Sequence, residues 1–135
     1  VRGTATVLPF PDGAFDYALA MTSLCFVAHP TQAQHEMWRV SRRAVMLRLL
    51  HRRSLLHLAK GGRGGYRGAR WDLLSEVLGW TEGLAPTPEV LARWAVFLPG
   101  GGPIARRAEP LIPPRLPLGG FLAVCLRRPE ILGQR

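Results

Sequence analysis

The sequence predicts an α/β fold with a mainly parallel sheet, and three observations support that class. The chain has 135 residues and is 47% hydrophobic, which gives enough apolar surface for the core of one domain. Segments with helical periodicity alternate with apolar runs, an order typical of α/β folds. The apolar runs are dense, as in strands buried on both faces; they occupy residues 15–27, 44–50, 94–98 and 121–126.

The first half of the chain predicts a strand, a helix and a second strand. The run at 15–27 is the first strand, and Pro30 ends it because proline breaks regular pairing. Thr31 and Gln34 have the spacing of a capping box, which predicts a helix over 31–40. The next apolar run is the second strand.

The second half contains two predicted helix starts. Asp72 is expected to cap a helix over 72–80, and the segment Thr87-Pro88-Glu89 has the cap and first-position proline of another helix. The other predicted segments are a short helix at 54–60, a glycine-rich loop without regular structure at 60–68, a strand at 94–98, irregular proline-rich residues at 110–118 and a closing strand at 121–126.

The positive charge is concentrated in one block. The chain has 18 Lys and Arg against 9 Asp and Glu, a formal net charge of +9. Residues 39–70 contain nine arginines and Lys60 but no acidic residue. Such a block is compatible with a nucleic-acid footprint, a patch for an anionic membrane, a site for an anionic substrate or a solvated face.

The glycine-rich loop, KGGRGGYRG, lacks the motifs of nucleotide-binding loops. It contains no GxGxxG, and Lys60 precedes the glycines instead of following them as in a phosphate loop. Its RGGYRG part has the chemistry of an RNA-contacting segment, with arginines beside an aromatic ring. We favour a mobile lid beside a binding cleft, because glycines permit hinge motion. The residues at its edge are Tyr66, Arg67, Arg70 and Trp71.

Cysteine and histidine show no metal-site pattern. Cys25 and Cys125 form no CxxC motif, and we expect both to be reduced structural thiols. The histidines at 29, 35, 51 and 57 fit no zinc-ligand spacing. No apolar run reaches the roughly 18 residues of a membrane span, and the start at Val1 has no signal-peptide layout. We therefore expect a cytoplasmic protein.

Residues 3–16, GTATVLPFPDGAFD, resemble the G-x-A-E-x-L-P-F-x-D-x-S-F-D segment of class I S-adenosylmethionine-dependent methyltransferases of the type 11, small-molecule group. The similarity continues through LCFVAHP, through HEMWRV at 35–40 and to GGFLAV at 119–124. The resemblance implies a Rossmann-like sheet with strand order 3-2-1-4-5-7-6. It implies strands 4, 5, 6 and 7 at residues 16–22, 44–50, 94–98 and 121–126.

The resemblance is partial. Val1–Gly3 resembles the tail of strand 3, while strands 1 and 2 and the glycine-rich cofactor loop have no counterpart, and Thr6 replaces the acid of the motif. The turn before strand 5 is also shortened, to Arg39–Ala44. We therefore expect a single partial methyltransferase domain over 1–135, with core strands and a helix at 1–50, a basic glycine-rich lid at 51–71, and C-terminal helices and closing strands at 72–135.

The resemblance also implies a cofactor, S-adenosylmethionine, and places its two ends. The backbone N–H of Ala5 faces the adenine ring with Thr6 and Leu8 nearby, and Ala20 and Met21 lie beside the methionine part. Since the cofactor loop has no counterpart, we expect the chain alone to bind the cofactor weakly or not at all and to be inactive by itself.

Acceptor residues are expected after strand 4 and at the glycine-rich loop. Because in-line methyl transfer depends mainly on positioning, we predict no catalytic side chain. The expected substrate-binding residues are Cys25, Phe26, Tyr66, Arg67, Arg70 and Trp71.

The predicted function is methyl transfer from S-adenosylmethionine to a small-molecule acceptor. The alternative is a non-catalytic arginine-rich module that binds RNA or an acidic partner, which a steep salt dependence of RNA binding would favour. We expect no DNA partner. The exposed edge of strand 4 predicts self-association, and the basic segment Arg48–Lys60 is compatible with peripheral membrane contact.

Overall fold

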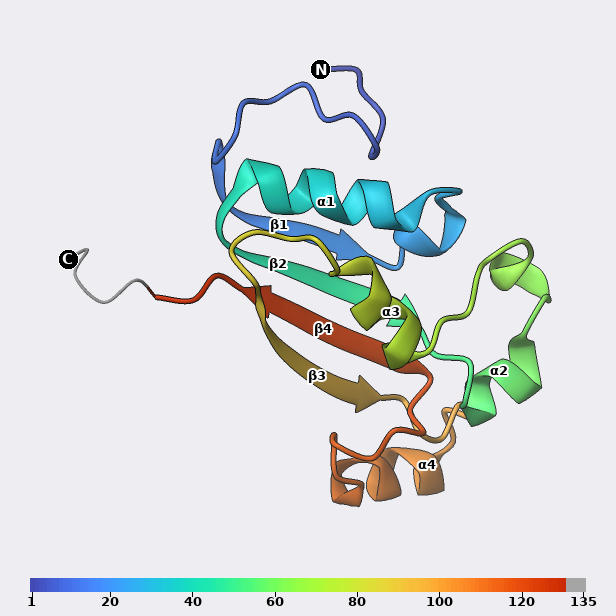
Figure 1. The fold of residues 1–135 in the computed structure, drawn as a ribbon. Helices are drawn as coiled ribbons and strands as arrows, with labels where there is room; N and C mark the ends of the chain where they lie inside the picture. The colour runs from blue at the N-terminus through green and yellow to red at the C-terminus, as the bar shows by residue number, and fades with distance from the viewer. Residues whose placement is uncertain (131–135) are drawn as a thin grey trace.

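The computed structural model describes residues 1–130, which form a four-stranded sheet with helices against one of its faces (Figure 1). The strands are β1 (Phe15–Met21), β2 (Ser41–Leu50), β3 (Glu89–Ala95) and β4 (Phe121–Arg127). Their order is β1-β2-β4-β3, with β1 and β2 parallel and β4 antiparallel to both of its neighbours. Residues 131–135, which end the predicted C-terminal part, lie outside the described residues.

Two helices cover the sheet and two lie beyond the ends of the strands. The helices α1 and α3 lie against one face, whereas α2 and α4 lie near the ends of β2 and β3 (Figure 1). The helices of the described chain are α1 (Pro30–Val40), α2 (Leu55–Lys60), α3 (Leu74–Trp80) and α4 (Pro103–Ala108), with 3-10 turns η1 (Leu24–Phe26), η2 (Gly64–Tyr66) and η3 (Glu109–Leu111).

The strand order is that of part of a Rossmann-like methyltransferase sheet. If β1, β2, β3 and β4 are taken as strands 4, 5, 6 and 7, the observed order reads 4-5-7-6, as the resemblance implies. The expectation of a mainly parallel sheet is wrong for these strands, because only the β1–β2 pair is parallel. The closing strand folds back between its two neighbours.

Strand β3 corrects two predictions. Residues 87–89 do not start a helix, and the strand predicted at 94–98 begins instead at Glu89. β3 pairs with β4 along its whole length, from Glu89 opposite Arg127 to Ala95 opposite Phe121. This long-range pairing outweighs the local cap signal, which is a weak preference by itself.

The predicted caps differ from the observed ones. Helix α1 begins at Pro30 with His29 as its N-cap, so Thr31 lies inside the first turn and the capping box is wrong. Helix α3 begins at Leu74, and Asp72 is buried in an ion pair instead of capping it. At α2 the cap lies where expected: Ser54 accepts a hydrogen bond from the His57 N–H.

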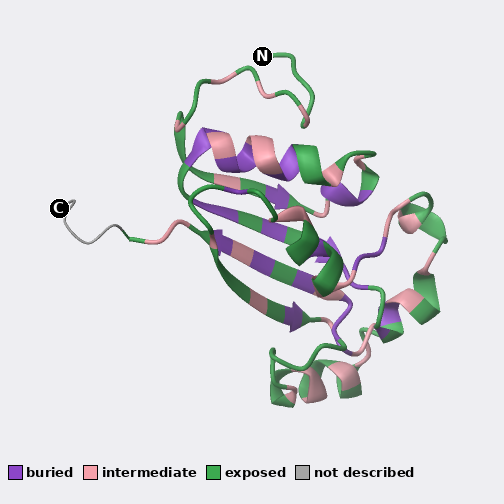
Figure 2. Cartoon of the chain, in the orientation of Figure 1, coloured by how far each residue is buried: buried purple, intermediate pink, exposed green. Residues whose placement is uncertain are grey.

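The hydrophobic core lies between the sheet and the two covering helices. Alternate residues of β2 and β4 face α1 and α3, as the purple segments in Figure 2 show. Gln34 is also fully buried, and neither polar atom of its side chain has a hydrogen-bond partner among the described residues. The main buried apolar residues are Ala20, Ala33, Met37, Trp38, Val45, Leu47, Leu49, Val77, Leu122, Val124 and Leu126.

The opposite face of the sheet is uncovered in the described chain. Strand β1 is therefore not buried on both faces, as the sequence predicts, because it has one neighbouring strand and helices over one side only. We call the uncovered surface the open face. Its exposed apolar residues are Phe15, Tyr17, Leu19, Met21, Met46 and Leu91.

The first residues run beside α1 and form no strand, so the expected tail of strand 3 is absent from the described residues, apart from an isolated bridge between Thr4 and Val7. The N–H of Leu8 donates to Glu36 at 2.8 Å. Arg39 donates to both carboxylate oxygens of Glu36, at 2.7 and 2.8 Å, and to the Leu8 carbonyl. The acid of α1 therefore ties this segment to the helix.

Replacing Glu36 with Gln is expected to release the first residues from α1 and to lower the unfolding free energy by about 1–2 kcal/mol. The hydrogen bond from Arg39 lowers the pKa of Glu36 to about 2 from 4.5. This contribution is complete above pH 4.5 and is lost as pH falls toward 2. Thermal unfolding at several pH values and proteolysis near Leu8 measure both effects. Asp16→Asn, which removes an exposed ion pair with Arg42, is the control and should change little.

Candidate functional site

The carboxyl ends of β1 and β2 lie at the same edge of the sheet, the position at which parallel α/β sheets bind ligands. Thr22 follows β1 in the left-handed region, with φ of 55°, and its N–H donates to the Arg48 carbonyl at 2.8 Å. The Arg48 side chain donates to the Thr22 hydroxyl at 2.9 Å and lies over the Phe121 ring. These contacts join the ends of three strands.

Arg70 holds the loop that follows β1. Its side chain donates to the carbonyls of Leu24 and Val27 at 2.9 and 2.8 Å, and its N–H donates to the Cys25 carbonyl at 2.8 Å. Its Nε donates to Asp72 at 2.7 Å. All three side-chain nitrogens therefore have partners within the chain, so Arg70 positions the site.

Asp72 is the most buried charged group near this edge. It is 2% exposed, and its second carboxylate oxygen has no partner among the described residues. Burial raises its pKa above 3.8, while the hydrogen bond from Arg70 opposes that shift. Its N–H donates to the Leu50 carbonyl at 2.8 Å, and it bridges to His51. The backbone of Asp72 thus extends the edge beyond β2.

An aromatic cluster lies beside Asp72. The Trp71 ring is between those of His57 and Tyr66, with centroid distances of 4.8 and 5.4 Å. Cys25 is buried in the same cluster, where its thiol donates to the Thr22 carbonyl at 3.3 Å and burial raises its pKa above 9.0. The indole N–H of Trp71 is buried without a partner among the described residues.

A cavity of about 590 Å³ lies next to the cluster. Arg52 and Glu76 form an ion pair at its wall, which lowers the pKa of Glu76, and Arg70 lies 5.1 Å from the Trp80 ring centre. The wall therefore offers both charged and aromatic groups to a small molecule. It is formed by Ala28, Pro30, Arg52, His57, Arg70, Trp71, Asp72, Glu76 and Trp80.

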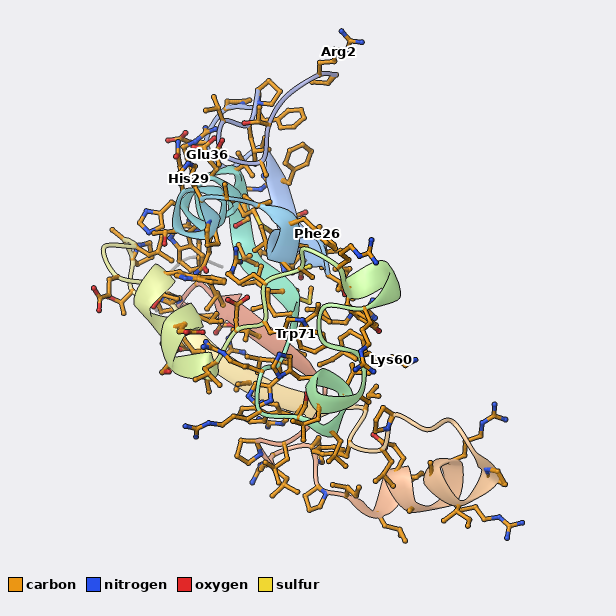
Figure 3. The ribbon with its side chains drawn as sticks, turned by 90° about the vertical axis from the view of Figure 1, so that its right-hand side faces the viewer. Arg2, Phe26, His29, Glu36, Lys60 and Trp71 are labelled. Atoms are coloured by element: carbon orange, nitrogen blue, oxygen red, sulfur yellow. The ribbon has the colours of Figure 1, made fainter. Side chains whose placement is uncertain are left out.

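Four of the six predicted acceptor residues are brought together. Cys25, Tyr66, Arg70 and Trp71 meet between η1 and the segment before α3. Phe26 is exposed on η1, outside this cluster (Figure 3), and Arg67 is exposed after η2.

The predicted cofactor residues lie in two places. Ala20 packs in the core, while Met21 is exposed on the open face. Ala5, Thr6 and Leu8 lie on the segment beside α1, where Gln32 donates to the Thr6 carbonyl at 3.2 Å and the Leu8 N–H is bound by Glu36. Among the described residues, no hydrogen bond joins the segment of Ala5, Thr6 and Leu8 to Met21.

The sequence does not mark Asp72, which lines the cavity, as a site residue, and it does not reveal the burial of His51 just after β2. His51 is buried, shares a hydrogen bond of 3.0 Å between its Nδ1 and the Gly119 carbonyl, and burial lowers its pKa below 6.5. The polar segment after β2 contains no motif that marks either residue. The one available signal is position, since His51 directly follows the apolar run at 44–50.

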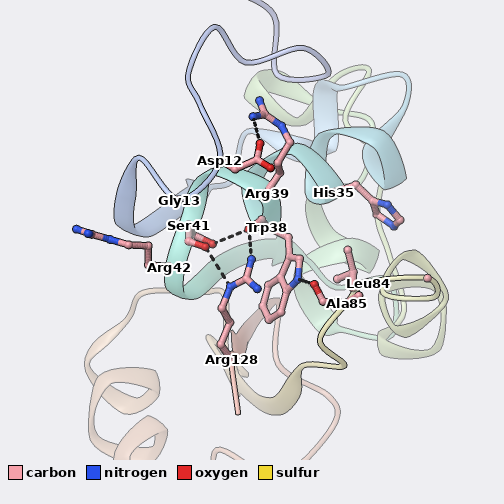
Figure 4. A pocket seen from close by; sticks show the side chains of 11 residues that line it. Asp12, Gly13, His35, Trp38, Arg39, Ser41, Arg42, Leu84, Ala85 and Arg128 are labelled. Atoms are coloured by element: carbon pink, nitrogen blue, oxygen red, sulfur yellow. Dashed lines mark hydrogen bonds and ion pairs between the residues drawn. The ribbon is translucent and has the colours of Figure 1, made fainter. Parts of the chain in front are cut away.

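A second cavity, of about 640 Å³, lies at the opposite edge of the sheet (Figure 4). Arg128 lies over the Trp38 ring there and donates to the carbonyls of Trp38 and Ser41 at 2.8 and 3.1 Å. Ser41 is the first residue of β2. Because ligands of these sheets bind at the carboxyl ends of parallel strands, this cavity is not the candidate site.

A family model described as a methyltransferase domain matches residues 1–48. Among solved structures, the chain is similar to an S-adenosylmethionine-dependent methyltransferase of Thermotoga maritima, with 22% identity, TM-score 0.67 and coverage of 96% of this chain and 63% of that chain. It is also similar to the cyclase SpnF, with 22% identity, TM-score 0.62 and coverage of 97% and 57%. A third is a methyltransferase solved with the Haloferax volcanii activator Trm112, with 13% identity, TM-score 0.59 and coverage of 98% and 61%.

The chain spans about three fifths of the length of these structures. At these identities the likeness establishes the fold alone, and a neighbour described as a cyclase shows that one fold hosts different reactions. No curated protein matches the chain. None of the helices within residues 1–130 has the length and apolarity needed to cross a membrane.

Proposed function

We propose that the chain is part of a class I S-adenosylmethionine-dependent methyltransferase and forms the acceptor side of a site that methylates a small molecule. The methyltransferase-domain match over residues 1–48 and the likeness of the fold to a solved methyltransferase support this proposal. The cavity beside Asp72 and Trp71 is the observation that carries this proposal. It lies at the carboxyl edge of the sheet and combines aromatic rings with charged groups.

The residues present fit part of the cofactor. Met21 exposes an apolar side chain at the end of β1, suited to the methionine part, and Ala5 and Thr6 offer backbone groups to the adenine ring. The ribose hydroxyls need a carboxylate, but Asp12 and Asp16 pair with arginines at the other edge of the sheet. The described residues can therefore contact the adenine and methionine ends of the cofactor. Because they offer no carboxylate to the ribose, we expect this chain alone to bind the cofactor weakly.

The chemistry follows from positioning. Bound S-adenosylmethionine supplies a methyl group on a positively charged sulfur, so an acceptor electron pair forms the new bond to carbon while the carbon–sulfur electrons return to sulfur. In this chain, Arg70 and Asp72 fix the loop after β1, and the rings of Trp71 and Tyr66 orient the acceptor. Correct alignment of the two reactants supplies most of the rate in such a displacement.

The proposal is tested by ultraviolet cross-linking of S-adenosylmethionine, labelled in its methyl group, to the 135-residue chain. We expect the label in the peptide that contains Met21, and we expect Met21→Trp to block it. Leu91→Trp, a matched change on the same open face but at β3, should leave the label in place. Label that is unaffected by Met21→Trp contradicts the proposed cofactor position. Calorimetry should detect weak binding, and low-micromolar affinity would contradict the partial fit.

A further inference from the structure

Some of the most exposed apolar side chains of the described chain lie on α2, on α4 and on the turn after α4, elements that Figure 1 shows at the same end of the sheet. Leu58 is 80% exposed on α2, while Ile104 on α4 and Leu111 on η3 are each 82% exposed. We call this surface the apolar end. Its exposed members are Leu55, Leu58, Ile104, Leu111, Leu116 and Leu118.

The apolar end is built from two segments that are distant in sequence. A cavity of about 630 Å³ lies between α2 and residues 97–118, and its wall is almost entirely apolar. Leu56 is buried on the inner side of α2, and a Cβ added at Gly120 would lie 2.7 Å from its Cβ. Close packing over Gly120 therefore holds α2 against the sheet while Leu55 and Leu58 face outward.

The charge of the apolar end is positive. Glu109 is the acid of residues 97–118, and its two oxygens accept hydrogen bonds from the N–H groups of Phe97 and Leu98, at 2.7 and 3.1 Å. Arg52 is paired with Glu76. The other cations form no ion pair with an acid of residues 1–130; they are Arg53, Lys60, Arg106, Arg107 and Arg115.

We propose that the apolar end docks onto an anionic lipid surface. Proteins that bind at a membrane surface insert apolar side chains below the headgroups and attract anionic lipids with basic residues. The exposed leucines and isoleucine can supply the first interaction, and the unpaired arginines can supply the second. Sites for single-stranded RNA typically present exposed aromatic rings on which bases stack. The one phenylalanine here, Phe97, is buried, and the nearby Tyr66 is packed on Trp71. The surface therefore favours lipid over RNA.

Docking would place the candidate site next to the membrane. The inner side of α2 contributes Leu56 and His57 to the Trp71 cluster, and its outer side contributes Leu55 and Leu58 to the apolar end. One six-residue helix thus joins the two surfaces. Docking stands independently of methyl transfer, because it depends on residues outside the site.

The test is co-sedimentation of the 135-residue chain with vesicles of phosphatidylcholine alone and of phosphatidylcholine with phosphatidylglycerol. We expect binding to the anionic vesicles and weaker binding to the neutral ones. The double variants Leu58→Gln with Ile104→Gln, and Arg106→Gln with Arg107→Gln, should each reduce the vesicle partition coefficient by about tenfold. All four residues lie on the surface, so circular dichroism should show unchanged folding.

The matched control is Leu91→Gln with Arg93→Gln on β3, an apolar and a basic residue of the open face. Unchanged vesicle binding by this control supports docking through the apolar end, whereas an equal loss places binding on the open face and overturns the proposal. Wild-type binding by the α2 and α4 variants also overturns it. Binding to homopolymeric RNA that is lost in the Arg106→Gln with Arg107→Gln variant, with no vesicle binding by the unchanged chain, assigns the surface to RNA instead and overturns the proposal.

Discussion

Arg70→Ala is expected to lower the unfolding free energy by about 3 kcal/mol, because it leaves Asp72 buried without its partner. The carboxylate of Asp72 is 2% exposed and has one hydrogen bond, from Arg70. The same substitution removes the bonds that hold the carbonyls of Leu24 and Val27. Chemical denaturation measures the loss, and faster proteolysis near Leu24 should accompany it.

A double-mutant cycle separates the charge from the lost packing. Asp72→Asn in the Arg70→Ala background removes the unpaired charge, so the double variant should be more stable than Arg70→Ala alone. Burial raises the pKa of Asp72, so the penalty of the single variant should also shrink as pH falls and the carboxylate is protonated. A double variant no more stable than Arg70→Ala would mean that the buried charge contributes nothing.

Leu47→Ala is expected to cost about 2–5 kcal/mol, the range for removing a buried leucine side chain from a packed core. Leu47 is 2% exposed on β2 and packs in the core between the sheet and α1. The matched control is Leu19→Ala on β1, whose side chain is 62% exposed on the open face. It should change the unfolding free energy by less than about 0.5 kcal/mol.

The comparison of Leu47 with Leu19 tests whether one face of the sheet is buried and the other is exposed. Leu19 pairs with Met46, and Leu47 pairs with Ala20, so the two leucines occupy adjacent rungs of the same β1–β2 ladder. Their backbone surroundings are similar and their burial is opposite. Equal losses for the two variants in thermal unfolding would mean that the open face is covered in solution.

Much of the strand order could be predicted from the sequence. The PFPDGAFD segment marks the start of β1, and the run at 121–126 becomes β4. The strand predicted at 94–98 overlaps only the end of β3, because β3 pairs with residues of β4 that lie 26 to 38 positions away and no local pattern reports that pairing. The prediction that β1 is buried on both faces is also wrong. A run of apolar residues does not show whether a neighbouring element covers each face of the strand.

Some of the predicted site residues lie together in the structure, while their roles stay predictions. The sequence singles out Tyr66, Arg70 and Trp71 at the edge of the glycine-rich loop, and the structure brings them close to Cys25. The sequence does not show that tertiary contacts use all three side-chain nitrogens of Arg70. Asp72 has the sequence context of a helix cap. Its burial appears only in the folded structure, where its neighbour Trp71 packs in one cluster with Leu50.

The outer edge of β1 has a consequence for assembly. β1 has no neighbour on that side within residues 1–130, so its free N–H and C=O groups form a template for another strand. Antiparallel contact between two β1 edges closes a symmetric pair, whereas a repeated unlike contact between the β1 edge of one copy and the β3 edge of the next grows into an open filament. If copies of the chain associate through the β1 edge, the edge that the second copy offers decides between a finite complex and a polymer.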